Sequence, residues 1–242
     1  MNANDLNVTK LFVVFALLLS CEKNEISVIH EIHDYRMDDV LYKKDSKLKH
    51  VYHQDRFFAE YQYDELNRIS RINYGDDIYA YDIYQYNTKG ELEKNYSYYL
   101  ENPPVLGHTV FFSYDDKGNK VKELKEFTDN RQTVYDLFQY SNGKLVKQEH
   151  YEGNKQTFYR IYEYKGDKLV KEKFYVPGER GFSTTEHFYE EGLLVYTYAG
   201  WRDERNYYDR NNNLVKRVAN VPYLSSSLNA TEFYIIWEYE YE

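Results

Sequence analysis

The chain of 242 residues is 42% hydrophobic and 19% aromatic, with 30 tyrosines, which suits one folded domain or one continuous repeat array and favours β-strands. A formal net charge of −9 and the lack of a basic stretch argue against nucleic acid as a partner, because phosphate backbones require a positive surface. The single cysteine, Cys21, excludes an intrachain disulfide and a thiolate-rich metal site.

Residues 1–20 have the pattern of a signal peptide. An unbroken apolar run over residues 11–19 follows Lys10 and ends at Ser20. At a rise of about 1.5 Å per residue, this run covers roughly half of the hydrocarbon thickness of a bilayer. It is therefore too short for a transmembrane helix and has the length of the apolar part of a signal peptide.

The motif Leu18-Leu19-Ser20-Cys21 resembles the lipobox of bacterial lipoproteins, in which the cysteine is lipidated and becomes the first residue of the mature chain. This resemblance implies a lipid on Cys21 and a tether over residues 21–30; the alternative is a buried cysteine at the end of a core helix. The next residues, Glu22-Lys23-Asn24-Glu25, are similar to the short acidic export signal of some Bacteroidetes lipoproteins. We therefore expect an outer-membrane lipoprotein that faces the cell surface or, otherwise, the periplasm.

Residues 31–242 are expected to form a single domain built from a repeated pattern. Two aromatic residues separated by one polar residue precede a turn with Gly or Asn, and an aliphatic and basic segment follows. The second aromatic of the seven copies is Tyr63, Tyr86, Tyr114, Tyr140, Tyr164, Tyr189 and Tyr208, and the last two copies are looser because their two aromatics are adjacent. Their spacing drifts around about 25 residues, as expected when loops vary and the unit is constant.

Each copy predicts one β-hairpin, because aromatic and polar residues alternate and the turn contains residues that tolerate positive φ. A lone hairpin is marginal in water, so we expect an all-β fold of about seven or eight consecutive antiparallel hairpins in a twisted, curled or closed sheet. Counting back from the repeat tyrosine places the tyrosines on one face and aliphatic or aromatic residues on the other. The second set is Ile83, Phe111, Leu137 and Ile161. We expect this second set inside and the tyrosines outside, with the opposite facing left open.

The dipeptides Tyr63-Asp64, Tyr114-Asp115 and Tyr208-Asp209 resemble the YD repeats of Rhs-type bacterial proteins, over roughly residues 58–218. The copies at Tyr86, Tyr140 and Tyr164 depart from the dipeptide, so the chain resembles a degenerate member. It is more similar to small Tyr-rich lipoproteins of Bacteroidetes, many of which end in an aromatic–acidic strand such as residues 239–242. The resemblance implies contact with carbohydrate or protein rather than catalysis.

Several patterns that could bind a metal have a simpler structural explanation. His-x-x-His occurs at His30/His33 and at His50/His53, but residues i and i+3 of a strand point to opposite faces. The oxygen-rich segment 209–213 lacks the later Gly and Glu of an EF-hand loop, so we predict a turn. Adjacent acids such as Asp115-Asp116 also point apart in a strand. We find no nucleophile elbow, phosphate-binding glycine loop or His-Glu-x-x-His motif. We therefore expect no enzyme, cofactor or metal site.

Aromatic side chains are the best candidates for ligand contact, since their rings stack on sugars while their polar atoms form hydrogen bonds. We select Trp201, Trp237, Tyr84 and Tyr162; the alternative is that aromatics only hold neighbouring strands together. The first hypothesis is a surface binding module for glycan or a cell-envelope protein. The second is a structural or assembly subunit that pairs through a sheet edge. A hydrolase with scattered carboxylates ranks last.

Overall fold

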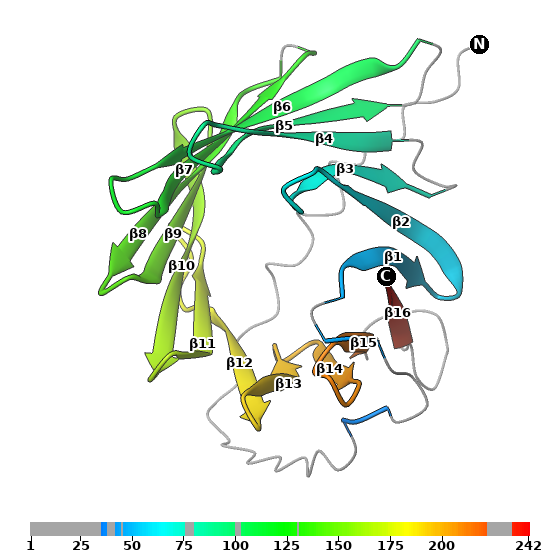
Figure 1. Ribbon diagram of the computed structural model, residues 1–242. Helices are drawn as coiled ribbons and strands as arrows, with labels where there is room; N and C mark the ends of the chain where they lie inside the picture. Colours follow the sequence, from blue (N-terminus) through cyan, green and yellow to red (C-terminus); the bar gives the residue numbers. More distant parts are fainter. Residues whose placement is uncertain are drawn as a thin grey trace, which may run out of the picture. The chain divides into compact units, whose positions relative to one another are not determined.

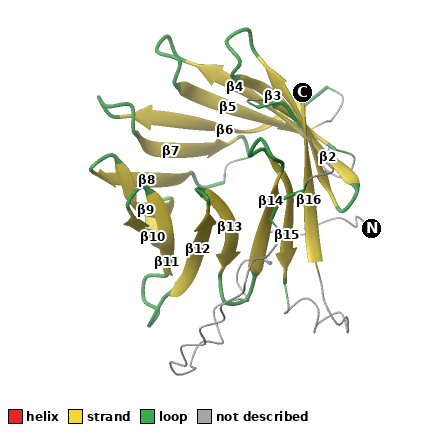
Figure 2. Ribbon diagram, turned by 60° about the horizontal axis from the view of Figure 1, so that its bottom comes forward, coloured by secondary structure: helices red, strands yellow, loops and turns green. Residues whose placement is uncertain are grey.

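The described part of the chain consists of strands and loops. The computed structural model describes residues 35–37, 42–44, 46–75, 80–99, 103–129, 131–221 and 234–242, all within the compact unit Ile32–Glu242. Figure 2 shows no helix in these ranges. The predicted signal peptide, the tether, Cys21, His30 and His33 lie outside the described residues.

The strands are β1 (Leu48–His53), β2 (Arg56–Tyr63), β3 (Ile69–Tyr74), β4 (Ala80–Tyr86), β5 (Leu92–Tyr99), β6 (Val105–Tyr114), β7 (Lys120–Phe127), β8 (Val134–Ser141), β9 (Lys144–Glu152), β10 (Lys155–Lys165), β11 (Lys168–Tyr175), β12 (Ser183–Glu190), β13 (Leu193–Tyr198), β14 (Asp203–Tyr208), β15 (Leu214–Asn220) and β16 (Tyr234–Tyr241). They form one closed antiparallel barrel, in which each strand pairs with its sequence neighbours and β1 pairs with β16 (Figure 1). The prediction of an all-β fold of consecutive antiparallel hairpins is confirmed. Each described strand has a hydrogen-bonded neighbour on both sides.

Seven hairpins are continuous in sequence, and an eighth is split between the two ends of the chain. Each repeat tyrosine lies at or near the end of an even-numbered strand and pairs with a residue at or near the start of the next, as Tyr86 does with Leu92. Tyr241 ends β16 in the same way and pairs with Leu48 at the start of β1. The repeat pattern in the sequence contains seven copies because the second half of the eighth hairpin stands first in the chain.

The residue after the repeat tyrosine shapes the turn. In the β6–β7 turn, Oδ1 of Asp115 accepts hydrogen bonds from the backbone N–H of Lys117 (2.9 Å) and of Asn119 (2.8 Å). Gly118 has a φ of 80°, a conformation that side chains disfavour. The same bonds recur in three further turns, with Asp64, Asn87 and Asp209 as acceptors. An Asp or Asn at this position thus organises the loop between two strands.

The repeat tyrosine itself connects successive hairpins. The Tyr86 hydroxyl donates to the carbonyl oxygen of Ile69 (2.8 Å), at the start of β3. The backbone ladder between β3 and β4 ends at the pair Arg71–Ile83, before it reaches Ile69. Equivalent bonds are made by Tyr63, Tyr114, Tyr140, Tyr208 and Tyr241. The hydroxyl therefore bridges two hairpins at the point where their ladder stops.

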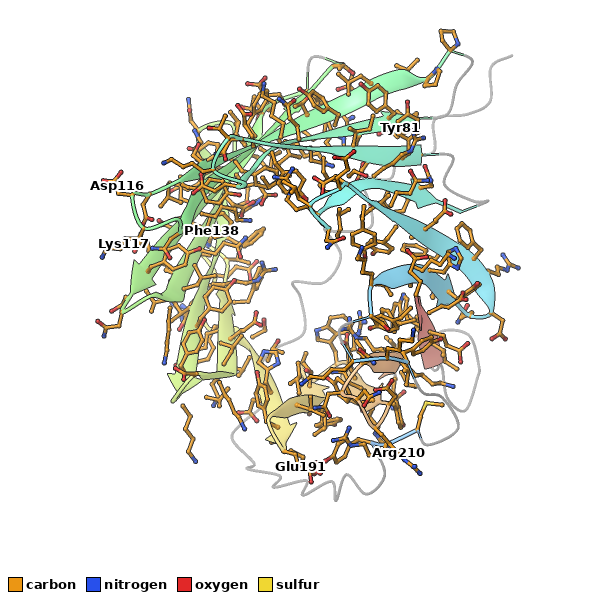
Figure 3. All side chains as sticks on the ribbon, in the orientation of Figure 1. Tyr81, Asp116, Lys117, Phe138, Glu191 and Arg210 are labelled. Carbon is orange, nitrogen blue, oxygen red and sulfur yellow. The ribbon has the colours of Figure 1, made fainter. Side chains whose placement is uncertain are left out.

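One face of the sheet carries the hydrophobic cluster of Val51, Ala59 and Ile72, and Tyr84 packs against this cluster. Side chains of five neighbouring strands, from β16 through β1, β2 and β3 to β4, meet in this cluster, because Trp237 also packs against it. Such reach is expected on the concave side of a closed sheet. We call this side the inner face; side chains project from both faces (Figure 3).

The facing of the repeats is the opposite of the one we expected from the sequence. Tyr84 lies on the inner face, and the strand alternation puts Ile83 on the outer face, where it pairs with Arg71 and Tyr96. The same alternation places Phe111, Leu137 and Ile161 outside. The physical reason is that tyrosine hydroxyls find hydrogen-bond partners on the inner wall, whereas the outer aliphatics are covered by long charged neighbours.

A short segment before β1, which we call the strap (residues 35–37), lies across one end of the barrel. Tyr35 and Met37 form backbone hydrogen bonds with Tyr208 at the end of β14. Arg36 donates to the carbonyl oxygen of Asp209 (2.7 Å) and forms an ion pair with Glu191 (3.1 Å). The strap thus joins the β12–β13 and β14–β15 turns; Figure 3 labels Glu191 and Arg210 in these two turns.

Candidate functional site on the inner face

The inner face is largely polar and is not packed as a continuous core. Among the described residues, ten hydrophobic side chains are buried. A barrel of sixteen strands is too wide for its inner side chains to meet across the axis. Polar groups on this face must therefore find partners on the same wall, in solvent or in a ligand.

The most extensively bonded carboxylate on this face belongs to Asp82 of β4. It accepts hydrogen bonds from the hydroxyls of Tyr74 (2.9 Å), Ser97 (2.6 Å) and Tyr84 (3.5 Å). Burial, and next the charge of Asp82, raises the pKa of both Tyr74 and Tyr84. Both phenols therefore stay neutral donors at physiological pH. We call these four residues the Asp82 cluster.

Asn95 of β5 adjoins this cluster and has an unused donor. It pairs with Tyr84 across the β4–β5 ladder and is 8% exposed. Its Oδ1 lies 3.5 Å from the Ser97 hydroxyl, which donates its proton to the closer Asp82, and its Nδ2 has no partner among the described residues. An unsatisfied buried donor costs about 1–3 kcal/mol. The Asn95 amide therefore marks a position where an external acceptor would be stabilised.

Three basic side chains, from β6, β7 and the β7–β8 loop, lie beyond β5. Burial, and next the charge of Lys125, lowers the pKa of His108 to about 4, so its imidazole is neutral near pH 7. Burial, and next Arg131, also lowers the pKa of Lys125. The Lys125 ammonium lies 5.1 Å from the ring centroid of Phe127, and the Arg131 guanidinium lies 4.2 Å from the same centroid. Positive groups thus adjoin the Asp82 cluster.

A second hydrogen-bonded group surrounds Tyr162 of β10. The Tyr162 hydroxyl donates to Oε1 of Gln148 (2.7 Å), and Nε2 of Gln148 donates to Oδ1 of Asp136 (2.8 Å). Nδ1 of His150 lies 3.0 Å from the same Asp136 oxygen, and its ring stacks on Phe158 with centroids 4.3 Å apart. Burial raises the pKa of Tyr162. This group combines aromatic rings with fixed hydrogen-bonding groups, as the Asp82 cluster does.

The two tryptophans have different surroundings. Trp237 of β16 stacks on His53 with ring centroids 5.3 Å apart, and the Arg202 guanidinium lies 5.6 Å from the Trp237 ring. Trp201 lies in the β13–β14 turn and is 54% exposed. This turn belongs to the end of the barrel away from the repeat turns. Other large exposed side chains at that end are Phe57, Tyr99, Val105, Phe182 and Tyr198.

The structure places three of the four candidate residues on the inner face. Tyr84 and Trp237 pack against the same hydrophobic cluster of Val51, Ala59 and Ile72, whereas Tyr162 of β10 lies on a separate part of the wall. Trp201 lies apart from them in a turn. Their role in ligand contact stays a prediction. Sequence reasoning missed Asp82 and Asn95; alternation from Tyr84 along β4 would have put Asp82 on the same face.

Sequence reasoning also missed three stacked tyrosine pairs on the outer face. Their members face each other across β4–β5, β8–β9 and β10–β11, with ring centroids 4.7–4.9 Å apart. The pairs are Tyr81–Tyr98, Tyr135–Tyr151 and Tyr159–Tyr175. The first tyrosine of each pair precedes a repeat tyrosine by a constant interval in the sequence, a signal that a full alignment of the copies reveals.

The structure describes two of the patterns that we considered as metal sites. His50 and His53 lie on opposite faces of β1: His50 contacts Glu240 (2.8 Å), whereas His53 stacks on Trp237. Segment 209–213 is a turn around buried Asp209. Burial alone would raise the Asp209 pKa, but hydrogen bonds from Asn213 and from the backbone N–H of Tyr42 lower it. In the described ranges, no three His, Cys, Asp or Glu side chains are placed to hold a metal ion.

Fold and site together define a closed barrel of β-hairpin repeats with a polar, aromatic inner wall. Among the described residues, no helical segment has the length and apolarity needed to cross a bilayer. No family model matches the chain, and a search of curated proteins finds no match.

Solved structures similar to the chain include two complexes and one porin-like protein. The crystal structures of TcdB2-TccC3 and TcdB2-TccC3-Cdc42 each match 68% of this chain at 13% identity and a TM-score of 0.40. The chain spans only 12% and 11% of their respective lengths. A porin-like protein from Bacteroides uniformis matches 67% of this chain and 91% of its own length, at 11% identity and a TM-score of 0.42. Similarity at this level carries no argument about function.

Proposed function

We propose that this chain is a non-enzymatic exported lipoprotein with YD-type repeats that binds a glycan on the inner face of its barrel. The Asp82 cluster and Asn95 carry the proposal, because they combine aromatic rings, an oriented carboxylate and an unused amide donor on one wall. Sugars present apolar ring faces beside hydroxyl groups, and such a wall complements both.

The state of the inner carboxylates supports binding rather than catalysis. Asp82 accepts from three hydroxyls, and Asp136 is held by Gln148 and His150. Carboxylates with several donors on the protein keep a fixed orientation. They are thus suited to shaping a wall that orients a ligand.

A protein partner is the alternative ligand. The hypothesis of partner binding through a sheet edge needs an unpaired strand, and each described strand is paired on both sides. A protein partner would therefore have to dock on side chains. The proposed location is the outer membrane, through a lipid on Cys21, at the cell surface or otherwise at its periplasmic side; this rests on the lipobox resemblance.

The test is binding of the purified protein to a glycan array, beside the variants Tyr84→Ala and Trp201→Ala. We expect selective binding that weakens roughly tenfold or more in Tyr84→Ala, since stacking and a hydrogen-bonded hydroxyl are lost together. Trp201→Ala tests whether the exposed turn at the end of the barrel contributes.

Tyr81→Ala is the matched control, because Tyr81 lies on the same strand as Tyr84 but on the outer face. Circular dichroism must show that all variants keep the fold. A blank array from folded protein would exclude glycan as the ligand. Equal losses in Tyr84→Ala and Tyr81→Ala would exclude the inner face as the site.

A further inference from the structure

We propose that the bound glycan is acidic and that its carboxylate binds on the inner wall between Asn95 and Lys125. This inference rests on the proposed function and adds the charge of the ligand to it. The position is defined by two donor groups from strands β5 and β7, on either side of Val110 of β6.

The strand register places these groups in one row. Asn95 pairs with Val110, and Val110 pairs with Lys125, so all three lie on the inner face. With strands spaced by about 4.8 Å, the Cα atoms of Asn95 and Lys125 lie roughly 10 Å apart. Val110 has the shortest side chain of the three and is buried. The amide and the flexible ammonium can therefore reach past Val110 and converge on one small group.

Among the described residues, neither donor has a hydrogen-bond acceptor or a carboxylate at bonding distance. Asn95 Nδ2 has no partner among the described residues. Within the described part of the chain, the Lys125 ammonium contacts the Phe127 ring and has no carboxylate at ion-pair distance. The nearby carboxylates are already engaged: Asp82 accepts from three hydroxyls, and Glu123 forms an ion pair with Lys120 (2.7 Å).

The charge of this part of the wall favours an anion. The Arg131 guanidinium also lies over the Phe127 ring, and its ion pair with Asp129 (2.7 Å) is half-exposed. A carboxylate offers acceptors only and thus matches an ammonium and an amide donor together. A neutral hydroxyl would satisfy the amide but would leave the partly desolvated ammonium without a counter-charge.

The experiment uses the full chain on an array of uronate-containing oligosaccharides, each paired with its carboxyl-reduced, neutral form. We expect the acidic forms to be bound and the reduced forms to bind roughly tenfold or more weakly. Lys125→Met should reduce binding of the acidic form by a similar factor, so that the acidic form no longer binds better than the reduced form. Asn95→Ala should weaken binding of the acidic form as well.

Lys122→Met is the matched control, because Lys122 lies on the same strand but on the outer face, over the Tyr135 ring. If the acidic and reduced forms bind equally well, or if Lys125→Met and Lys122→Met behave alike, the carboxylate site is wrong while the glycan proposal stands. If neither form binds and neutral glycans also fail, the proposed function itself is wrong. Thermal unfolding of Lys125→Met and of Lys125→Gln shows whether both variants remain folded. A loss of binding in a folded variant can then be assigned to the site.

Discussion

His108 is the residue at which stability and pH are most directly linked. Its pKa is about 6.5 in an unfolded chain and about 4 in the barrel. Between these values the unfolded state binds more protons, so the stability is complete above about pH 6.5 and falls as the pH drops towards 4. The full shift corresponds to at most about 3 kcal/mol, and partial exposure reduces the expected loss to about 1–2 kcal/mol. Urea unfolding at pH 7 and pH 4.5 measures this loss.

His108→Gln provides the comparison. The variant should lose less stability between the two pH values than the parent protein, because it lacks the imidazole that must take up a proton on unfolding. Equal losses in both proteins would mean that His108 is already protonated in the folded barrel at pH 4.5.

The sequence predicts the individual residues of the candidate site only in part. Tyr84 and Tyr162 follow from composition and alternation, since each belongs to a repeat. The choice of inner face did not follow, because both faces of the repeat contain apolar residues and the curvature that separates them arises from all strands together. Asn95 and Lys125 gain their importance from the pairing of β5, β6 and β7, which one strand alone does not specify.

At the level of the strands, one tyrosine hydroxyl connects successive hairpins in each of six repeats. Tyr86→Phe removes the donor to Ile69 while keeping the ring that stacks with the Arg68 guanidinium (4.2 Å). The expected loss in the free energy of unfolding is about 1 kcal/mol, the typical net contribution of one hydrogen bond. Urea denaturation of Tyr86→Phe beside Tyr81→Phe measures it, because Tyr81 stacks within its own hairpin and is absent from the bridge. A Tyr81→Phe loss as large as that of Tyr86→Phe would contradict the bridging role.

The hairpins were predictable because their determinants are local. Tyrosine, the turn-forming Asp or Asn, and the Gly or Asn with positive φ stand within a few residues of one another. The strap was not predictable, because Arg36 contacts Asp209 across a separation of 173 residues and lies outside the repeat pattern.

Arg36→Ala tests whether the strap holds the two turns that it joins. We expect faster hydrogen exchange at two backbone amides: that of Met37, which donates to the carbonyl oxygen of Tyr208, and that of Tyr208, which donates to the carbonyl oxygen of Tyr35. Exchange in β4–β9 should change little. Arg68→Ala is the control, since Arg68 holds the equivalent aspartate, Asp64, inside a different turn. Exchange that stays slow at Tyr208 in Arg36→Ala would show that backbone bonds alone keep the strap in place.

At the scale of the whole molecule, closure couples the repeats. An open array of repeats has contacts only between neighbours and can lose its ends without losing its middle. Here β1 and β16 pair across the entire sequence, as His50 and Glu240 illustrate with a separation of 190 residues. The sequence allowed a curled or a closed sheet, because no local pattern reports whether the last strand meets the first. Closure depends on the number of strands and their stagger.

Removal of residues 222–242 tests this coupling, because it deletes β16 and leaves β1 and β15 without a neighbour. Two unpaired edges favour pairing between molecules, so the truncated chain should form dimers or larger oligomers in size-exclusion chromatography. Its unfolding transition should also become broader, since the ring no longer closes. A peptide of residues 231–242 added in excess should restore the monomer by supplying the missing half of the eighth hairpin, whereas a scrambled peptide should not. A truncated chain that stays monomeric, with an unchanged unfolding midpoint, would show that β16 contributes little to the barrel and that the first fifteen strands are stable as an open sheet.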